Sequence, residues 1–158
     1  MMQMPRAPFQ VLVLPYRRTN AGEFQFALFQ RADDGFWQGI AGGGEDDETP
    51  LQAARRESLE EARIPAGCPL MPLQTMCMVS VTSFSVVWPP LPSGEERSVI
   101  PEFAFGVAAE GCEIVISCEH YAFAWLSYSA ALAILHYDSN RTALWELNQR
   151  LQGKGPRD

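Results

Sequence analysis

GGGEDDETPLQAARRESLEEARI, residues 42–64, is the stretch from which the rest of the chain can be interpreted. Three glycines and an acidic turn precede a segment with the features of a helix start. Thr49 is a favourable N-cap residue, Pro50 suits the first helical position, and Gln52 stands where a capping-box partner belongs. The sequence therefore predicts a helix that begins immediately after Thr49.

Three glutamates lie on one face of this expected helix. With a rotation of about 100° per residue, Glu57, Glu60 and Glu61 fall within an arc of roughly 100°. Carboxylates this close repel one another, and a divalent cation would remove that cost. Hard cations such as Mg²⁺ bind carboxylate oxygens and leave positions for phosphate oxygens and water. The alternative is a solvated acidic face that pairs with Arg55 and Arg56. The residues expected on the opposite, apolar side are Leu51, Ala54 and Ala62.

The spacing of the whole stretch favours the metal-binding interpretation. The residues whose spacing matters are Gly42, Glu48, Arg56, Glu57, Glu60, Glu61 and Ile64. This pattern resembles the signature of the Nudix hydrolases, and every charged position of that signature is filled. The resemblance implies hydrolysis of a nucleoside diphosphate linked to another moiety, with Mg²⁺ or Mn²⁺ as the cofactor.

Two residues depart from the signature. Ser58 stands where the family has an aliphatic residue, so its hydroxyl must find a backbone acceptor. Arg63 stands where the family has a glycine. It must adopt a left-handed conformation at a cost of about 1–2 kcal/mol, or the helix must end in another way. Neither departure removes a metal ligand.

The resemblance also implies a role for each matched residue. Glu57 and Glu61 would be the primary metal ligands, with Glu60 supporting a further ion or a metal-bound water. Arg56 would orient Glu57 or Glu60 through a charge-assisted hydrogen bond. Ala41 matches the position whose backbone carbonyl often reaches the metal.

The loop before the helix supplies the expected substrate contacts. Gly42 and Gly43 would let backbone groups approach a phosphate closely, and the helix N-terminus adds partial positive charge. Glu48 would anchor this loop through backbone amides or through Arg56. Trp37 is more typical of a core or rim aromatic residue, but its position just before the glycines also makes it a candidate for stacking on a base.

Family members commonly add a carboxylate from beyond the helix, as a ligand or as a general base. The candidates are Glu102, Glu113 and Glu119. We favour Glu119, because it precedes an aromatic strand and its loop could lean over the cleft. The neighbouring His120 is a second candidate base, although a lone histidine after a strand is more often a packed or solvent-facing residue.

Three further segments narrow the expected substrate. RADDGFWQGIAGGGE (31–45), EHYAFAWL (119–126) and SNRTALWEL (139–147) resemble the bacterial dATP pyrophosphohydrolases that also cleave dihydroneopterin triphosphate. Gln30 stands where that subgroup tends to have an arginine, which leaves Arg31 as the candidate for contacting terminal phosphates. Asn140 would either belong to the subgroup motif or cap the last helix.

The predicted activity is therefore a Mg²⁺-dependent pyrophosphohydrolase that converts a nucleoside triphosphate, or a related compound, into a monophosphate and pyrophosphate. The alternatives are hydrolysis of nucleotide sugars or dinucleoside polyphosphates, and a catalytically silent nucleotide-binding domain. Silent domains usually lose metal ligands, whereas this chain keeps all three helical glutamates.

Composition limits the other possibilities. A chain of 158 residues with 47% hydrophobic and 20% charged residues indicates one domain over residues 1–158. The net charge of −7 argues against binding a nucleic-acid polymer. We expect no membrane span, no signal peptide and a cytoplasmic protein. The four cysteines lack C-x-x-C spacing, which favours reduced thiols over zinc. The family resemblance leaves a homodimer possible.

The order of expected elements indicates an α+β fold, and the resemblance implies a Nudix-type α/β/α sandwich with a mixed central sheet. Strands are expected at 9–16, 23–31, 73–88, 98–108, 113–117 and 121–126, the first two as a hairpin. Besides the helix after Thr49, helices are expected at 129–135 and 140–151. Residues 89–97 read as a loop and 152–158 as a frayed tail.

Overall fold

The computed structural model describes residues 6–81 and 88–154. Its elements, in chain order, are β1 (Arg6–Arg18), β2 (Phe24–Arg31), β3 (Trp37–Gln38), β4 (Ile40–Glu45), α1 (Pro50–Ala62), β5 (Leu70–Ser80), β6 (Val99–Ala108), β7 (His120–Leu126), α2 (Tyr128–Ile134) and α3 (Asp138–Leu151). None of the helices in this described part of the chain has the length and apolar character that crossing a bilayer requires.

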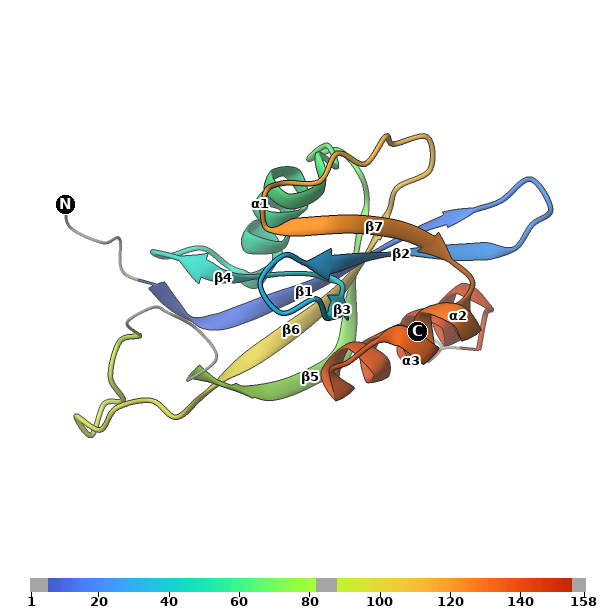
Figure 1. The fold of residues 1–158 in the computed structure, drawn as a ribbon. Coiled ribbons are helices and arrows are strands. Elements are labelled where there is room, and N and C mark those ends of the chain that lie inside the picture. The colour runs from blue at the N-terminus through green and yellow to red at the C-terminus, as the bar shows by residue number, and fades with distance from the viewer. Residues whose placement is uncertain (1–5, 82–87, 155–158) are drawn as a thin grey trace.

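Over the described residues the strands form one seven-stranded mixed sheet between two helical layers (Figure 1). The sheet order is β3-β2-β1-β6-β5, with β4 also paired to β1 and β7 also paired to β2. β1 and β6 run parallel, and the other pairs are antiparallel. α1 covers one face, and α2 and α3 cover the other. The predicted α+β sandwich with a mixed sheet is therefore confirmed.

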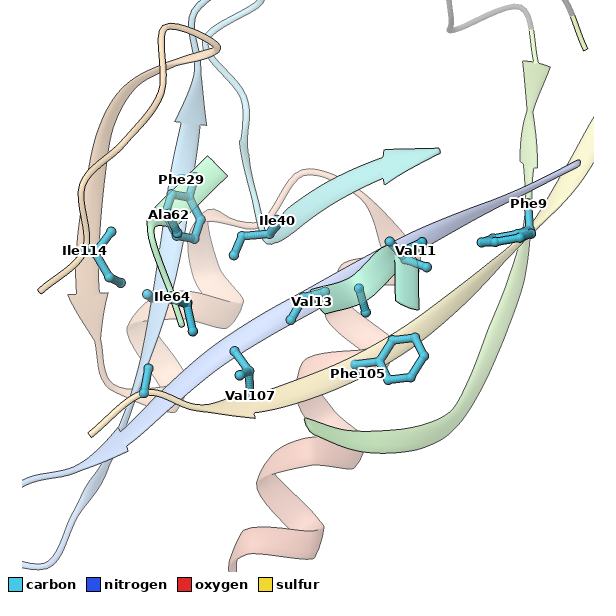
Figure 2. Packing of buried hydrophobic residues seen from close by; sticks show 14 of the residues in the cluster. Phe9, Val11, Val13, Phe29, Ile40, Ala62, Ile64, Phe105, Val107 and Ile114 are labelled. Atoms are coloured by element: carbon cyan, nitrogen blue, oxygen red, sulfur yellow. The ribbon is translucent and has the colours of Figure 1, made fainter. Parts of the chain in front are cut away.

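The central strand β1 is buried on both faces, and its alternation builds two core layers. Val11 and Val13 point towards α1, whereas Leu12 and Leu14 point towards α2 and α3, and all four are fully buried. Figure 2 shows the α1 layer, where the two valines lie beside Phe105 of β6. β1 is thus the rigid support on which α1 and its glutamates rest.

The start of α1 follows the sequence prediction. Thr49 is the N-cap, its side chain accepts from the Gln52 amide, and the Gln52 side chain accepts from the Thr49 amide at 2.8 Å. The underside of the helix differs from expectation, because Leu51 is 38% exposed and lies outside the core. Glu57 and Glu61 instead share the buried face with small alanines. The helix therefore turns carboxylates, not only apolar groups, towards the sheet.

Both departures from the signature are accommodated locally. The Ser58 hydroxyl donates to the Ala54 carbonyl at 2.7 Å, which supplies the backbone acceptor it needs. Arg63 adopts the left-handed conformation, with φ 57° and ψ 29°, and its amide bonds back to the last turn. The helix therefore ends as it would with glycine, but with a residue that is strained there.

Replacing Arg63 with glycine is expected to stabilise the protein. The side chain is exposed, so relief of the left-handed strain is worth about 1 kcal/mol, or roughly 2–4 °C in melting temperature. Thermal unfolding of Arg63→Gly measures this shift. Arg63→Ala is the matched control, because it removes the same side chain and keeps the strain. An equal rise in both variants would place the effect in the arginine side chain instead.

Three other expectations about secondary structure are wrong or fall partly outside the described residues. The glycine run forms β4, which strand propensity does not predict. Residues 113–117 form no strand, because the Val115 amide donates to the end of α1, at the Ala62 carbonyl, and Ile114 packs into the core. The long strand expected at 73–88 is described only as far as Ser80 of β5. Residues 82–87, and residues 155–158 of the expected tail, lie outside the described residues.

Candidate active site

The glycine strand β4 passes directly beneath the glutamates of α1. A Cβ atom added at Gly42 would lie 2.2 Å from the Glu57 carboxyl group, so only a glycine permits this approach. One residue earlier, the Ala41 amide donates to Glu61 Oε2 at 3.2 Å. The strand thereby brings both the glycines and Ala41 against the two buried glutamates, Glu57 and Glu61.

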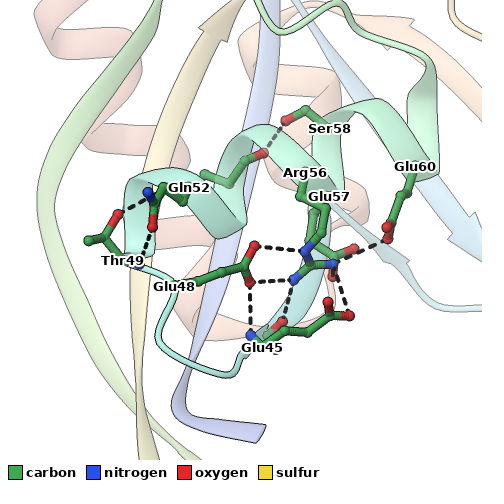
Figure 3. Close-up of polar contacts among 10 residues, drawn as sticks. Glu45, Glu48, Thr49, Gln52, Arg56, Glu57, Ser58 and Glu60 are labelled. Carbon is green, nitrogen blue, oxygen red and sulfur yellow. Dashed lines mark hydrogen bonds and ion pairs between the residues drawn. The ribbon is translucent and has the colours of Figure 1, made fainter. Parts of the chain in front are cut away.

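Arg56 connects the acidic residues of this region (Figure 3). Its Nε and Nη2 atoms donate to both oxygens of Glu48, at 2.9 and 3.0 Å. Nη1 donates to Glu57 at 2.8 Å and to Glu60 at 3.2 Å, and Nη2 also reaches the Gly43 carbonyl at 2.9 Å. A planar guanidinium suits such a shared arrangement because its donors point in fixed directions. The position of each carboxylate therefore depends on Arg56.

Glu48 holds the turn between β4 and α1. Besides pairing with Arg56, it accepts a hydrogen bond from the Glu45 amide at 2.8 Å. The hydrogen bond from Arg56 holds the pKa of Glu48 below its usual range. Glu48 therefore stays ionised and fastens the loop to the helix, the connection that the sequence led us to expect of it.

Burial disfavours the ionised forms of Glu57 and Glu61. Their exposed fractions are 7% and 4%. Burial raises the pKa of Glu57 to about 7, although Arg56 opposes the shift. Burial also raises the pKa of Glu61 to about 10, and a hydrogen bond to Glu119 and the charges of Glu57 and Glu119 add to it. Two buried carboxylates that lie beside one another with raised pKa values form a site that a bound cation would stabilise.

Of the three carboxylates considered beyond the helix, Glu119 is the one that reaches this cluster. It ends the loop before β7, and its side chain is hydrogen-bonded with Glu61. Glu102 lies on the opposite face of the sheet, where the Gln10 amide donates to its buried carboxyl group. Glu113 is exposed on the loop that follows β6. Glu119 is therefore the carboxylate that the structure brings to the glutamates of α1, and its role as a ligand or base stays a prediction.

Arg31 and Trp37 are placed less favourably for substrate. The Arg31 guanidinium is paired with Asp33 and lies 3.5 Å from Asp34, within its own turn. That turn still borders the site, because the Ala32 amide donates to the Glu119 carbonyl at 2.9 Å. Trp37 packs into the core layer that faces α2 and α3. It therefore occupies the core or rim position that the sequence favoured, across the sheet from the glutamates.

Asn140 does not cap α3, so that alternative is wrong. The N-cap of α3 is Tyr137, which makes no side-chain cap hydrogen bond. Asn140 is buried, and its Oδ1 accepts from the Gly39 amide at 2.8 Å. The contact joins positions that are 101 residues apart, and no local pattern signals it. It fastens the start of α3 to the backbone immediately before β4.

His120 is a packed residue. It is 6% exposed, and its ring lies 5.3 Å from that of Phe29. Burial lowers the pKa of His120, which favours the neutral imidazole. Within the described residues its Nδ1 atom is buried and has no hydrogen-bond partner. This is the packed alternative that the sequence left open for the residue.

The fit of a cation rests on the donor chemistry. Within residues 6–81 and 88–154, no three His, Cys, Asp or Glu side chains converge into a ready-made metal centre. Arg56 instead pairs with Glu57 and Glu60. Glu61 is hydrogen-bonded with Glu119. The candidate donors are all oxygens, the set that hard cations prefer. A divalent cation would also stabilise the ionised form of the two buried glutamates, whose pKa values are raised mainly by burial. The residues therefore fit Mg²⁺ or Mn²⁺ in chemistry.

In the absence of a cation, Glu61 is expected to destabilise the folded protein as the pH rises. Its folded pKa of about 10 lies above the ordinary value of 4.5, so the unfolded chain loses this proton first. The stabilising contribution is fully present below about pH 4.5 and is lost as the pH rises towards about 10. Glu61→Gln should therefore melt close to wild type at about pH 5 and several degrees higher at about pH 8, in a chelating buffer.

The control for this experiment is Glu113→Gln, which makes the same charge change on an exposed residue. Its melting temperature should differ from wild type by the same small amount at both pH values. A Glu61→Gln difference that does not widen between about pH 5 and about pH 8 would show that Glu61 ionises normally in the folded protein.

Comparison with known proteins agrees with this geometry. Residues 8–145 match the family model of the NUDIX domain. The chain is 30% identical over 141 residues to dihydroneopterin triphosphate diphosphatase of Escherichia coli K12, covering 88% of this chain and 91% of that protein.

Two solved structures extend the comparison. A Listeria monocytogenes protein assigned to the NUDIX hydrolases is 37% identical, with a TM-score of 0.82, over 93% of this chain and 96% of that one. The E. coli dihydroneopterin triphosphate pyrophosphohydrolase is 30% identical, with a TM-score of 0.70, over 90% and 95% of the two chains. The chain described here belongs to the Nudix hydrolase family.

Proposed function

We propose that this Nudix hydrolase is a Mg²⁺- or Mn²⁺-dependent pyrophosphohydrolase that cleaves a nucleoside triphosphate, or a pterin triphosphate, to a monophosphate and pyrophosphate. The observation that carries the proposal is the pair of buried glutamates, Glu57 and Glu61, which lie against the glycine strand and whose pKa values are raised by burial. The triphosphate substrate class is supported by the E. coli relative, which is named for dihydroneopterin triphosphate.

In this proposal the carboxylates of α1 and of the loop before β7 hold the cations. Glu57 and Glu61 are the primary ligands, Glu60 and Glu119 supplement them, and the Ala41 carbonyl is a further oxygen donor. When bound, the cations would offset the negative charge of the phosphates and lower the pKa of a water molecule. Because the pKa of Glu61 is raised, binding a cation there requires this carboxyl group to lose its proton, so metal affinity should increase with pH.

Arg56 acts as a positioning residue. Its guanidinium is shared among Glu48, Glu57 and Glu60, so it fixes where their oxygens lie without taking part in the chemistry. Glu48 in turn holds Arg56 from the loop side and stays ionised because its pKa is lowered. The pair therefore keeps the ligand oxygens in place before substrate arrives, which saves reorganisation during the reaction.

The substrate phosphates would lie against the glycine strand. At Gly42 the backbone comes close to Glu57 because no Cβ intervenes, and Gly43 extends the same surface. Arg31 contributes to the phosphates only if they displace Asp33 or Asp34 from its guanidinium. Such an exchange is accessible because the ion pair is partly exposed, where salt bridges contribute little. Trp37 packs on the other face of the sheet from the glutamates, so it would contact a substrate only if part of the substrate reached that face.

Glu119→Gln is expected to lower turnover by about 10²-fold, because it removes a negative oxygen from the ligand set or removes the general base. Steady-state kinetics with Mg²⁺ measure the effect, and Glu113→Gln on the same loop is the matched control. An unchanged turnover number in Glu119→Gln would assign the role to another residue.

A substrate panel tests the proposed function. Purified protein with Mg²⁺ is given dATP, dihydroneopterin triphosphate, ADP-ribose and diadenosine tetraphosphate, and released pyrophosphate and phosphate are measured separately. We expect pyrophosphate from one or both triphosphates. Turnover of ADP-ribose or the dinucleotide alone would support the alternative substrate classes. Binding of a nucleotide without turnover of any compound would identify a silent domain and contradict the proposal.

A further inference from the structure

Two cysteines that are far apart in the sequence lie next to each other in the fold. The Sγ atoms of Cys68 and Cys112 are 3.5 Å apart, although 44 positions separate the residues. Cys68 lies between α1 and β5, and Cys112 lies between β6 and β7. Both are free thiols and both are partly buried. We propose that Cys68 and Cys112 are an oxidation site, at which a peroxide converts the two thiols into a reversible intramolecular disulfide.

The surrounding backbone holds the two thiols within reach of each other. The Cys68 amide donates to the Pro65 carbonyl at 3.0 Å, and the Cys112 amide donates to the Ala109 carbonyl at 3.1 Å. Each cysteine therefore sits in a hydrogen-bonded turn. Both side chains also pack against the core layer beneath α1. The pair is kept together by the fold and does not depend on the thiol contact itself.

Bond formation requires only a small movement. The sulfurs of a disulfide are about 2.05 Å apart, so the two Sγ atoms must approach by roughly 1.5 Å. Rotation about the Cα–Cβ bonds supplies such a shift. The nearby segment is also fastened to the helix, because the Val115 amide donates to the Ala62 carbonyl at 3.2 Å. This hydrogen bond holds the segment that follows Cys112 against the end of α1, the helix that precedes Cys68.

The oxidation balances with a peroxide as the co-reactant. One cysteine, as the thiolate, attacks a peroxide oxygen, which forms a sulfenic acid and releases hydroxide. The second thiol attacks the sulfenic sulfur, the S–S bond forms, and water leaves. With hydrogen peroxide the sum is two thiols and one peroxide giving one disulfide and two waters. A dithiol reductant reverses the product.

The environment indicates a slow reaction. Burial and the neighbouring Cys112 raise the pKa of the Cys68 thiol, so little of it is thiolate near neutral pH. The remaining cysteines differ in placement, since Cys118 is exposed and Cys77 lies on β5. They provide internal comparisons, because among residues 6–81 and 88–154 neither has another sulfur at hydrogen-bond distance.

The disulfide would close a long loop that contains β5 and β6. Such a link restricts the unfolded chain and so favours the folded state, more strongly for longer loops. For a domain of this size the expected rise in melting temperature is about 5–10 °C. This effect does not involve the proposed metal site and does not depend on the proposed activity.

Peptide mapping and thermal unfolding test the proposal. The full chain is treated with hydrogen peroxide, remaining thiols are alkylated, and peptides are analysed by mass spectrometry without reduction. We expect one linked species joining the Cys68 and Cys112 peptides, two hydrogens lighter than the sum of the reduced peptides. A melting temperature higher by about 5–10 °C, lost again in dithiothreitol, should accompany it.

Variants separate this bond from other oxidation. Cys68→Ser and Cys112→Ser should each abolish the linked species and the rise in melting temperature, whereas Cys77→Ser should retain both. Oxidation of either thiol to a sulfinic acid without a linked peptide would overturn the proposal. So would a linked species that joins other cysteines, or an equal temperature rise in the two serine variants.

Discussion

Glu57→Gln is expected to reduce turnover by about 10²- to 10³-fold while the protein remains folded. The substitution keeps the shape of the side chain, and the amide oxygen can still accept from Arg56, which lies 2.8 Å away. What is lost is the negative charge that would bind a cation. Removing a buried carboxylate whose pKa is raised to about 7 does not weaken the fold at neutral pH.

Three measurements test this prediction: the turnover number with Mg²⁺, the affinity for Mn²⁺ by titration, and the melting temperature. The matched control is Asp47→Asn, which makes the same charge change in the exposed acidic turn and should leave all three close to wild type. Turnover near the wild-type value in Glu57→Gln would remove Glu57 from the site. Lost turnover together with a collapsed melting temperature would assign it a structural role.

Gly42→Ala is expected to lower turnover by an amount comparable to Glu57→Gln. Its effect on the free energy of unfolding should be small. The new Cβ would lie 2.2 Å from the Glu57 carboxyl group, so that carboxylate must move. Because the displaced atoms end a flexible side chain, the stability cost should fall near the low end of the 1–3 kcal/mol typical of overpacking, at about 1 kcal/mol. The activity cost is large, because the displaced group is the proposed metal ligand.

Gly67→Ala is the control for this effect. A Cβ at position 67 meets nothing within 4 Å, so its turnover and melting temperature should stay near wild type. Wild-type kinetics in Gly42→Ala would show that Glu57 can act from a displaced position. A large fall in melting temperature with turnover near the wild-type value would indicate that the glycine serves packing alone.

The sequence predicts what depends on local chemistry. The capping box at Thr49 and Gln52 and the fixed spacing of charged residues locate α1 and its family. Strand alternation locates most of the sheet. Arg63 shows that even a departure from the family pattern can be interpreted, because a residue in the glycine position has few ways to end a helix.

The remaining features depend on contacts between distant segments. Three of the six residues of β4 are glycines, which have no strand preference, and the strand forms because β1 offers it hydrogen-bond partners. The contact of Asn140 with Gly39 and the thiol pair of Cys68 and Cys112 join segments that no local pattern relates. Residues 113–117 look like a strand, yet the Val115 amide donates to the end of α1. In each case the partner is visible only in three dimensions.

The parallel pairing of β1 with β6 has a consequence for how the molecule is made. One edge of β1 is satisfied early in synthesis, by β2 and by β4, which follow closely in the chain. The other edge waits for β6, because Gln10 is in register with Glu102. A nascent chain emerging from the ribosome therefore carries a hydrophobic strand with one side unpaired until residues near 108 have been synthesised. Pairings between such distant segments form slowly, so chaperone binding during that interval should suppress aggregation more than any later assistance.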